Sequence, residues 1–164
     1  MNKLELYKKP YLIAEIGINH NGSVAIAKKM IDAAKENNFD AVKFQKRDPD
    51  ICVPEDQKYK MRDTPWGNIT YLSYKKKIKL NLNQLTILKN YAKKLKLDFS
   101  ASCFDINSLN LMKRINSFNK IPSAMITNIF FLEHVAKQKK RTFNVGGIER
   151  SDNRTVAERY WHRC

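Results

Sequence analysis

Short apolar segments alternate with longer segments of helical periodicity along most of this chain of 164 residues. The short segments are bounded by Gly, Pro, Asn or Asp, which is typical of strands. Strands that alternate with helices form β/α units around a parallel sheet, so we predict an α/β fold. The predicted strands are 11–16 (YLIAEI), 40–45 (DAVKFQ), 98–103 (DFSASC) and 118–123 (FNKIPS), and 141–145 (RTFNV) could begin a fifth. The predicted helices run from the Ser23 cap to Asn37 and over 84–95, 106–115 and 128–138.

The number of predicted strands limits the architecture. A (β/α)8 barrel of the TIM type has eight strands and typically about 250 residues, whereas this chain offers four strands and part of a fifth. We therefore predict a partial (β/α)8 barrel containing about the first four to five β/α units. The polar segment 46–70 is longer than a usual connection, and we predict that it is a functional or a disordered loop.

Polar side chains lie at the end of each predicted strand or directly after it. Because the carboxyl ends of parallel strands meet at one edge of the sheet, we expect these side chains to converge there. A carboxylate, two amines, hydroxyls and amides at one edge have the composition of an anion-binding site, and buried lysine is rare unless it is paired. These residues are Glu15, Asn19, His20, Asn21, Lys43, Gln45, Ser100, Ser102, Lys120 and Ser123.

The end of the chain differs in composition from the rest. No lysine follows Lys140, while five of the eight arginines lie in the last 24 residues. We therefore predict two regions: 1–143 as barrel sequence and 144–164 as an atypical Arg-rich tail that is not native barrel sequence. A shifted reading frame or a rearranged gene end would produce such a tail, and an ordinary Arg-rich terminus is the alternative.

The formal net charge of +15 allows two interpretations. Such an excess favours anionic partners, but lysines spread over solvated helix faces give the same total. The two dense basic runs, 74–80 and 137–141, are not interleaved with the aromatic residues that a single-strand binder uses. We therefore expect no nucleic-acid partner.

Three widely spaced cysteines without a CxxC pair indicate neither a zinc site nor a disulfide framework. Free cysteines fit a reducing compartment, so we expect a cytoplasmic location. No segment contains the roughly 18 consecutive apolar residues of a membrane span, so we expect no membrane partner.

Several linked motifs resemble the N-terminal half of the N-acetylneuraminate (sialic acid) synthase family, from about residue 10 to about residue 143. Legionaminate and pseudaminate synthases are close relatives in that family. The motifs are IAEIGINHNGS (13–23), AKKMIDAAKENNFDAVKFQKR (27–47), CVPEDQKYKMRDTPWGNITYLSYK (52–75), FSASCFD (99–105) and NKIPSAMITN (119–128).

The resemblance implies a (β/α)8 barrel transferase that condenses phosphoenolpyruvate with an N-acylmannosamine-type sugar. The products are a nine-carbon 2-keto acid and phosphate. A divalent cation, Mn²⁺ or Mg²⁺, is expected for the full-length family, which is dimeric. The metal-binding histidines of the family belong to the half beyond this resemblance, and His134 and His162 match neither of them, so no metal ligand is assigned in this chain.

Roles for individual residues also follow from the resemblance. Lys43 and Lys120 would hold the phosphate and carboxylate of phosphoenolpyruvate, with hydrogen bonds from Ser102 and Ser123. Glu15 would lie near the reacting carbons as an acid, a base or a clamp, and its structural alternative is an ion pair with Lys43. The mouth of the site would be lined by Gln45, Asn19, His20 and Asn21.

Three interpretations remain open at the level of sequence. His20 is either a substrate contact or a turn residue bonded to the backbone. Met125 occupies a place where some members carry a substrate-contacting carboxylate, which leaves the sugar open. The chain itself is either an active synthase, a truncated inactive remnant of one, or, least favoured, a basic nucleic-acid-binding domain.

Overall fold

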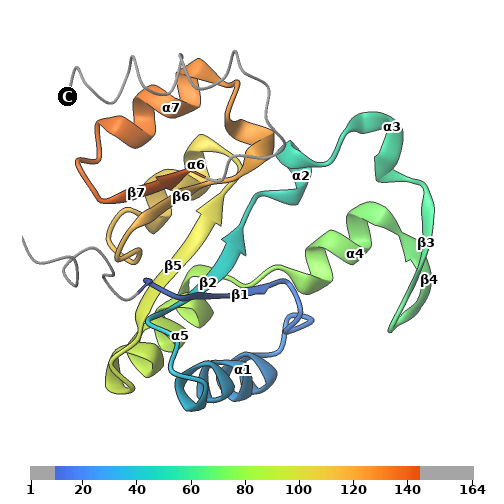
Figure 1. The fold of residues 1–164 in the computed structure, drawn as a ribbon. Helices are drawn as coiled ribbons and strands as arrows, with labels where there is room; N and C mark the ends of the chain where they lie inside the picture. Colours follow the sequence, from blue (N-terminus) through green and yellow to red (C-terminus); the bar gives the residue numbers. More distant parts are fainter. Residues whose placement is uncertain (1–9, 145–164) are drawn as a thin grey trace, which may run out of the picture.

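The computed structural model describes residues 10–144, and within them the predicted parallel α/β arrangement is confirmed. Strands β1, β2 and β5 form a parallel sheet in that order, and β6 and β7 form a parallel pair. The pair lies beside β5, because the Ser117 amide donates to the Phe99 carbonyl oxygen at 2.8 Å and the Ser100 hydroxyl donates to the Phe118 carbonyl oxygen at 2.7 Å. The spatial order is therefore β1-β2-β5-β6-β7 (Figure 1). The strands are β1 (Ile13–Gly17), β2 (Ala41–Lys46), β5 (Asp98–Cys103), β6 (Asn119–Ile121) and β7 (Thr142–Asn144).

One continuous apolar core lies between the sheet and four helices. Residues of every second strand position, such as Val42, Phe44 and Phe99, pack against apolar helix positions such as Ile31 and Leu88. The opposite, concave face of the sheet carries the polar strand residues described below. The helices are α1 (Val24–Glu36), α5 (Leu82–Lys94), α6 (Ile106–Met112) and α7 (Ile129–Ala136).

Side-chain caps fix where these helices begin. The predicted Ser23 cap of α1 is confirmed, since its hydroxyl accepts a hydrogen bond from the Ile26 amide at 3.3 Å. Asn81 and Gln84 form a reciprocal capping box at the start of α5. Asp105 and Asn128 cap α6 and α7 by accepting hydrogen bonds from the Ser108 and Phe131 amides. Each cap satisfies an amide group of the first helical turn that has no partner within the helix. The cap residue thereby fixes the position at which the helix begins.

The segment predicted as a long loop contains regular structure instead. Two single-turn helices and a β-hairpin occupy residues 49–70, and a further helix follows directly, so we call residues 49–78 the arm (Figure 1). Gly67 closes the hairpin turn with a φ of +88°, and Thr70 caps the last helix. The elements are α2 (Pro49–Cys52), α3 (Glu55–Lys58), β3 (Met61–Thr64), β4 (Gly67–Thr70) and α4 (Tyr71–Ile78). Elements of four residues are too short to show a hydrophobic period, so the sequence pattern missed them.

Aromatic rings bring the two ends of the strand order together. Tyr11, just before β1, stacks on Phe143 of β7 with ring centroids 5.9 Å apart. Phe118 meets both rings edge-on, and Arg141 lies over Tyr11 and Phe143 at 4.7 and 4.6 Å. The sheet is therefore curled, and this cluster fills its concave side at the N-terminal end of the strands.

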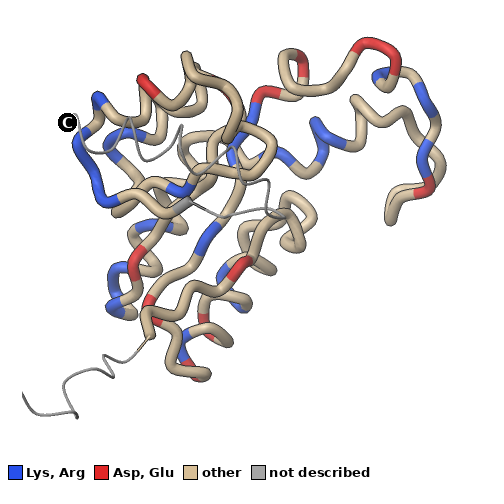
Figure 2. Tube along the Cα trace, turned by 45° about the horizontal axis from the view of Figure 1, so that its top comes forward, with Lys and Arg blue, Asp and Glu red and all other residues tan. Residues whose placement is uncertain are grey.

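Charged residues are distributed over the whole described part of the chain. Figure 2 shows Lys and Arg on the helices, the strands and the arm, with Asp and Glu among them. Within residues 10–144, no helix is both long and apolar enough to cross a lipid bilayer. The predicted Arg-rich tail begins at Asn144, the last residue of β7, and otherwise lies outside the described residues.

Candidate active site

The register of the parallel strands places the predicted polar residues in two rows on the concave face. Glu15 pairs with Lys43, and Lys43 pairs with Ser100 across the next strand. Gln45 and Ser102 form the second row, closer to the C-terminal ends of the strands. Side chains of residues i and i+2 of a strand lie on the same face, so both rows face the same space.

Lys43 and Glu15 form an ion pair at the centre of this face. The side chain of Lys43 is 7% exposed, whereas that of Glu15 is 52% exposed. The ion pair expected as the structural alternative for Glu15 is therefore present. A carboxylate that remains half exposed can still reach a ligand, whereas the ammonium group of Lys43 is held in place by the strand.

Lys120 contributes a second ammonium group to the same space. Burial lowers the pKa of Lys120, the cation of Lys43 lowers it further, and the carboxylate of Glu15 offsets part of the effect. Charges act on one another's pKa only over short distances, so Lys120 lies within electrostatic range of Lys43 and Glu15. Two cations facing a single, half-exposed carboxylate leave a net positive charge.

The two serines of β5 differ in their availability to a ligand. The hydroxyl of Ser100 is used within the fold, because it donates to the Phe118 carbonyl oxygen. The hydroxyl of Ser102 is buried and has no hydrogen-bond partner among the described residues. A buried hydroxyl without a partner is costly unless a ligand or water satisfies it. Ser123 is exposed directly after β6, at the start of a 3₁₀ turn.

The turn after β1 holds His20 inside the fold. Its ring is 1% exposed, its Nδ1 accepts a hydrogen bond from the Gly22 amide at 2.9 Å, and it also bonds to the Gly17 backbone. Burial lowers the pKa of His20, with the Gly17 bond opposing it. Of the two open interpretations, this geometry favours the turn residue over the substrate contact. Asn19 and Asn21 are exposed on the same turn.

Glycines allow this turn to approach its neighbours. Gly17 has a φ of +58°, and a β-carbon there would lie 3.2 Å from the Glu15 carboxylate and 3.6 Å from the Gln45 amide nitrogen. Gly22 has a φ of +75°, and a β-carbon there would collide with the Lys77 carbonyl oxygen of α4. The turn therefore packs closely against the candidate site through Gly17 and against the arm through Gly22.

Arg47 is the residue at this rim that the sequence reasoning missed. Its guanidinium donates to the Gln45 side-chain oxygen and lies 4.0 Å from the centre of the Phe104 ring. Residues 43, 45 and 47 share one face at every second position, so extending the strand period past the predicted end would have found it. Met125 is half-buried and packs against the core.

No metal centre can be assembled from the residues that the structure describes. Within residues 10–144, no three His, Cys, Asp or Glu side chains gather in a way that could hold a metal ion. Cys52 and Cys103 are free thiols, and burial raises the pKa of Cys52 to about 11.

Comparison with known proteins was made for both sequence and structure. The NeuB family matches residues 30–158. The chain is 34% identical to N,N'-diacetyllegionaminic acid synthase of Campylobacter jejuni over 89% of this chain and 46% of that protein. It is 38% identical to N-acetylneuraminate-9-phosphate synthase of Drosophila melanogaster over 80% of this chain and 36% of that protein.

Among solved structures, the sialic acid synthetase of Leptospira borgpetersenii in complex with citrate superposes with a TM-score of 0.83. It is 25% identical, and the match covers 95% of this chain and 51% of that one. A truncated 3-deoxy-D-arabino-heptulosonate 7-phosphate synthase of Thermotoga maritima has the same fold at a TM-score of 0.64 and 11% identity. The chain thus spans about half or less of the length of these relatives. It belongs to the NeuB family.

Proposed function

We propose that this chain carries the phosphoenolpyruvate-binding part of a sialic-acid-type synthase. The reaction joins phosphoenolpyruvate to an N-acylmannosamine-type sugar in its aldehyde form, consumes one water, and yields a nine-carbon 2-keto acid and phosphate. The observation that carries the proposal is the pair of ammonium groups of Lys43 and Lys120 on the face that also carries Ser102, whose hydroxyl has no hydrogen-bond partner among residues 10–144. The five parallel strands β1, β2, β5, β6 and β7 correspond in this proposal to the first part of a (β/α)8 barrel, whose active site lies at the carboxyl ends of its strands.

The charges of the site match those of the substrate. Phosphoenolpyruvate carries a phosphate and a carboxylate, and two separate point charges can neutralise both groups at once. Lys43 is already desolvated and oriented by β2 and by Glu15, so little reorganisation is needed on binding. Ser102 would donate its free hydroxyl, and Ser123 would close the site from the start of the turn after β6.

Glu15 has a different role in this proposal. When the substrate anion takes over the contact with Lys43, the carboxylate of Glu15 is released toward the open side of the site. There it can hold or accept a proton near the reacting carbons. Gln45, Asn19 and Asn21 would line the mouth, and His20 would keep the turn in place through its two backbone contacts.

A divalent cation such as Mn²⁺ or Mg²⁺ belongs to the expected chemistry of the family. The described residues do not fit such a group, because no three candidate ligands gather in them. No step is therefore assigned to a metal here. The full enzyme is expected to be a dimer.

The names of the relatives indicate different sugar products. The Drosophila protein is described as forming N-acetylneuraminate 9-phosphate and the Campylobacter protein as forming diacetyllegionaminic acid. Both a phosphorylated and an unphosphorylated sugar are therefore candidate substrates for this chain.

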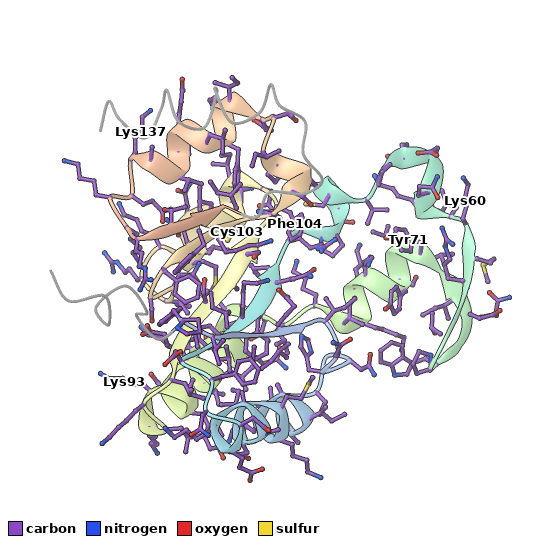
Figure 3. The ribbon with its side chains drawn as sticks, viewed as in Figure 1. Lys60, Tyr71, Lys93, Cys103, Phe104 and Lys137 are labelled. Atoms are coloured by element: carbon purple, nitrogen blue, oxygen red, sulfur yellow. The ribbon has the colours of Figure 1, made fainter. Side chains whose placement is uncertain are left out.

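Titration of the purified chain with phosphoenolpyruvate, followed by calorimetry, tests the proposal. The chain should bind the ligand, and Lys43→Ala and Lys120→Ala should each weaken binding at least tenfold. Lys93→Ala is a matched control, since Lys93 is exposed on the outer surface of α5 (Figure 3). Binding that is unchanged in both site variants would remove these lysines from the site. Phosphate release after addition of N-acetylmannosamine and Mn²⁺ would separate an active synthase from an inactive remnant.

A further inference from the structure

Arg47 follows β2 at the carboxyl end of the sheet, and the chain on both sides of it is fixed. The Phe104 amide donates to the Lys46 carbonyl oxygen at 3.3 Å, and the Asp48 amide donates to the Asp105 carboxylate at 2.9 Å. The guanidinium group lies 4.0 Å from the centre of the Phe104 ring, which Figure 3 labels. Among residues 10–144, no carboxylate forms an ion pair with this group. Its charge therefore does not tie two elements together through an acidic residue.

The guanidinium group of Arg47 sets the orientation of the Gln45 side-chain amide. A guanidinium group has only hydrogen-bond donors, so the amide atom that faces it must be the oxygen. The structure has this arrangement, with Nη2 of Arg47 donating to Oε1 of Gln45. The NH2 group of Gln45 therefore points away from Arg47. Its nitrogen lies 3.6 Å from the position that a β-carbon of residue 17 would occupy, and Oε1 of Glu15 lies 3.2 Å from the same position. The donors of Gln45 thus face the side of the candidate site that carries Glu15.

This orientation decides whether the second row offers donors or acceptors to a ligand. Gln45 and Ser102 are direct register partners, and the Ser102 hydroxyl has no hydrogen-bond partner among the described residues. Lys43 lies on the same face of β2, about 7 Å along the strand from Gln45. With the amide held as it is, both members of the row can donate to an anion beside Lys43. A flipped amide would present its carbonyl oxygen instead, which repels an anion.

We propose that Arg47 is a positioning residue of the candidate site, which holds the Gln45 amide with its NH2 group toward a negatively charged oxygen of phosphoenolpyruvate. This inference rests on the function proposed above and makes Gln45 a direct donor to that anion. Arg47 acts through Gln45 and does not touch the ligand. Without a donor at position 47 the amide is free to rotate, and ordering it again on binding lowers the affinity.

Calorimetric titration of the full chain with phosphoenolpyruvate tests the role of Arg47. Arg47→Met keeps a long side chain against Phe104 but removes the donors, so it should weaken binding about tenfold, which corresponds to one lost hydrogen bond to a charged group. Arg47→Lys keeps a cation that can only donate, so its affinity should stay within about threefold of that of the unchanged chain.

Lys79→Met is the matched control for the loss of one positive charge near the same end of the sheet. Lys79 lies 3.6 Å from the Asp48 carboxylate, and its charge helps to lower the pKa of the buried Lys46. The side chain of Lys79 is exposed and does not bond to Gln45. The affinity for phosphoenolpyruvate should therefore change by less than about twofold, because exposed charges are screened by salt.

Gln45→Leu separates the positioning role of Arg47 from a direct effect of its charge. In a Gln45→Leu background, Arg47→Met should change the affinity by less than about twofold, because the two residues act on one interaction. NMR gives a second measurement. The side-chain NH2 signal of Gln45, identified by its loss in Gln45→Leu, should shift when phosphoenolpyruvate binds the unchanged chain. In Arg47→Met the shift should be absent or much smaller.

Unchanged affinity in Arg47→Met would overturn the inference. An Arg47→Met effect that persists in Gln45→Leu would overturn it as well, because the guanidinium group would then act by its own charge. The NMR measurement on the unchanged chain does not depend on the folding of any Arg47 variant, and a Gln45 signal that does not move on binding is also a contradiction. Affinity that depends on Lys43 and Lys120 but not on Arg47 would leave the proposed function standing. No binding of phosphoenolpyruvate at all would overturn both.

Discussion

At the scale of single residues, Lys43 and Lys120 show how a fold can hold like charges together. Lys43 is nearly buried and is paired with Glu15. Lys120 interacts electrostatically with both Lys43 and Glu15, and its pKa is lowered by burial and by the charge of Lys43. The unpaired excess of positive charge costs free energy in the ligand-free protein, which an anionic ligand would recover.

The pKa of the Lys120 side chain provides a test at this scale. NMR titration of the amine should give a value below the ordinary 10.5, because burial and the neighbouring cation both disfavour the charged form. Lys43→Gln removes the repulsion and should raise the value again. Phosphoenolpyruvate affinity in the unmodified chain should fall as the pH rises through this lowered pKa, since Lys120 then loses its charge. A Lys120 pKa of 10.5 or above would contradict this account, and so would a pKa that does not change in Lys43→Gln.

At the scale of elements, Asp105 joins the loop after β2 to the helix after β5. Its carboxylate caps α6 through the Ser108 amide at 2.6 Å and also accepts the Asp48 amide at 2.9 Å. Burial alone would raise the pKa of Asp105, but the hydrogen bonds from Ser108 and Asp48 lower it overall. The arm begins at Pro49, directly after Asp48, so this one side chain fixes where the arm leaves the sheet.

Replacement of Asp105 tests the link between these elements. Asp105→Ala should lower the free energy of unfolding by about 2–3 kcal/mol, because a buried helix cap and a second amide lose their acceptor. Urea denaturation at pH 7 measures the loss. Since the folded-state pKa is depressed, the stabilisation is present above the unfolded-state pKa of 3.8 and disappears as the pH falls through the lower folded value.

Ser23→Ala is the comparison for that experiment. Ser23 caps α1 through one longer hydrogen bond of 3.3 Å, so its loss should cost only about 1 kcal/mol. An equal decrease in the free energy of unfolding in the two variants would show that Asp105 acts only as a helix cap and does not stabilise the start of the arm.

At the scale of the whole molecule, the aromatic cluster defines the curvature of the sheet. Tyr11 and Phe143 lie at opposite ends of the strand order and yet stack on one another, with Phe118 between the two ends. The cluster occupies the N-terminal side of the concave face, and the charged groups occupy the C-terminal side. The apolar residues thus close one end of the face, which leaves the other end for a ligand.

Two phenylalanines allow the contribution of the cluster to be measured. Phe118 is 2% exposed within the cluster, whereas Phe130 is 63% exposed on α7. Phe118→Ala should lower the free energy of unfolding by about 3–5 kcal/mol through lost packing, and Phe130→Ala should change it by less than about 0.5 kcal/mol. Urea denaturation of both variants gives the comparison. Similar values for the two would mean that the cluster does not hold the ends of the sheet together.

The sequence by itself determined the elements whose signals are local. Strand β5 has the bounds predicted from DFSASC, and α1 begins at its predicted cap, because alternation, helical period and capping depend on neighbouring residues alone. The same local pattern placed Glu15, Lys43 and Lys120 within strands, and the structure has them inside β1, β2 and β6. Only the tertiary structure decided the rest. Strand β1 begins at Ile13 and not at Tyr11, because Tyr11 turns away to pack on Phe118 and Phe143. The coupling of Lys120 to Lys43, the burial of His20 and the grouping of Lys46 with Lys79 all join residues distant in sequence, and such contacts depend on how the sheet curls and not on any local pattern.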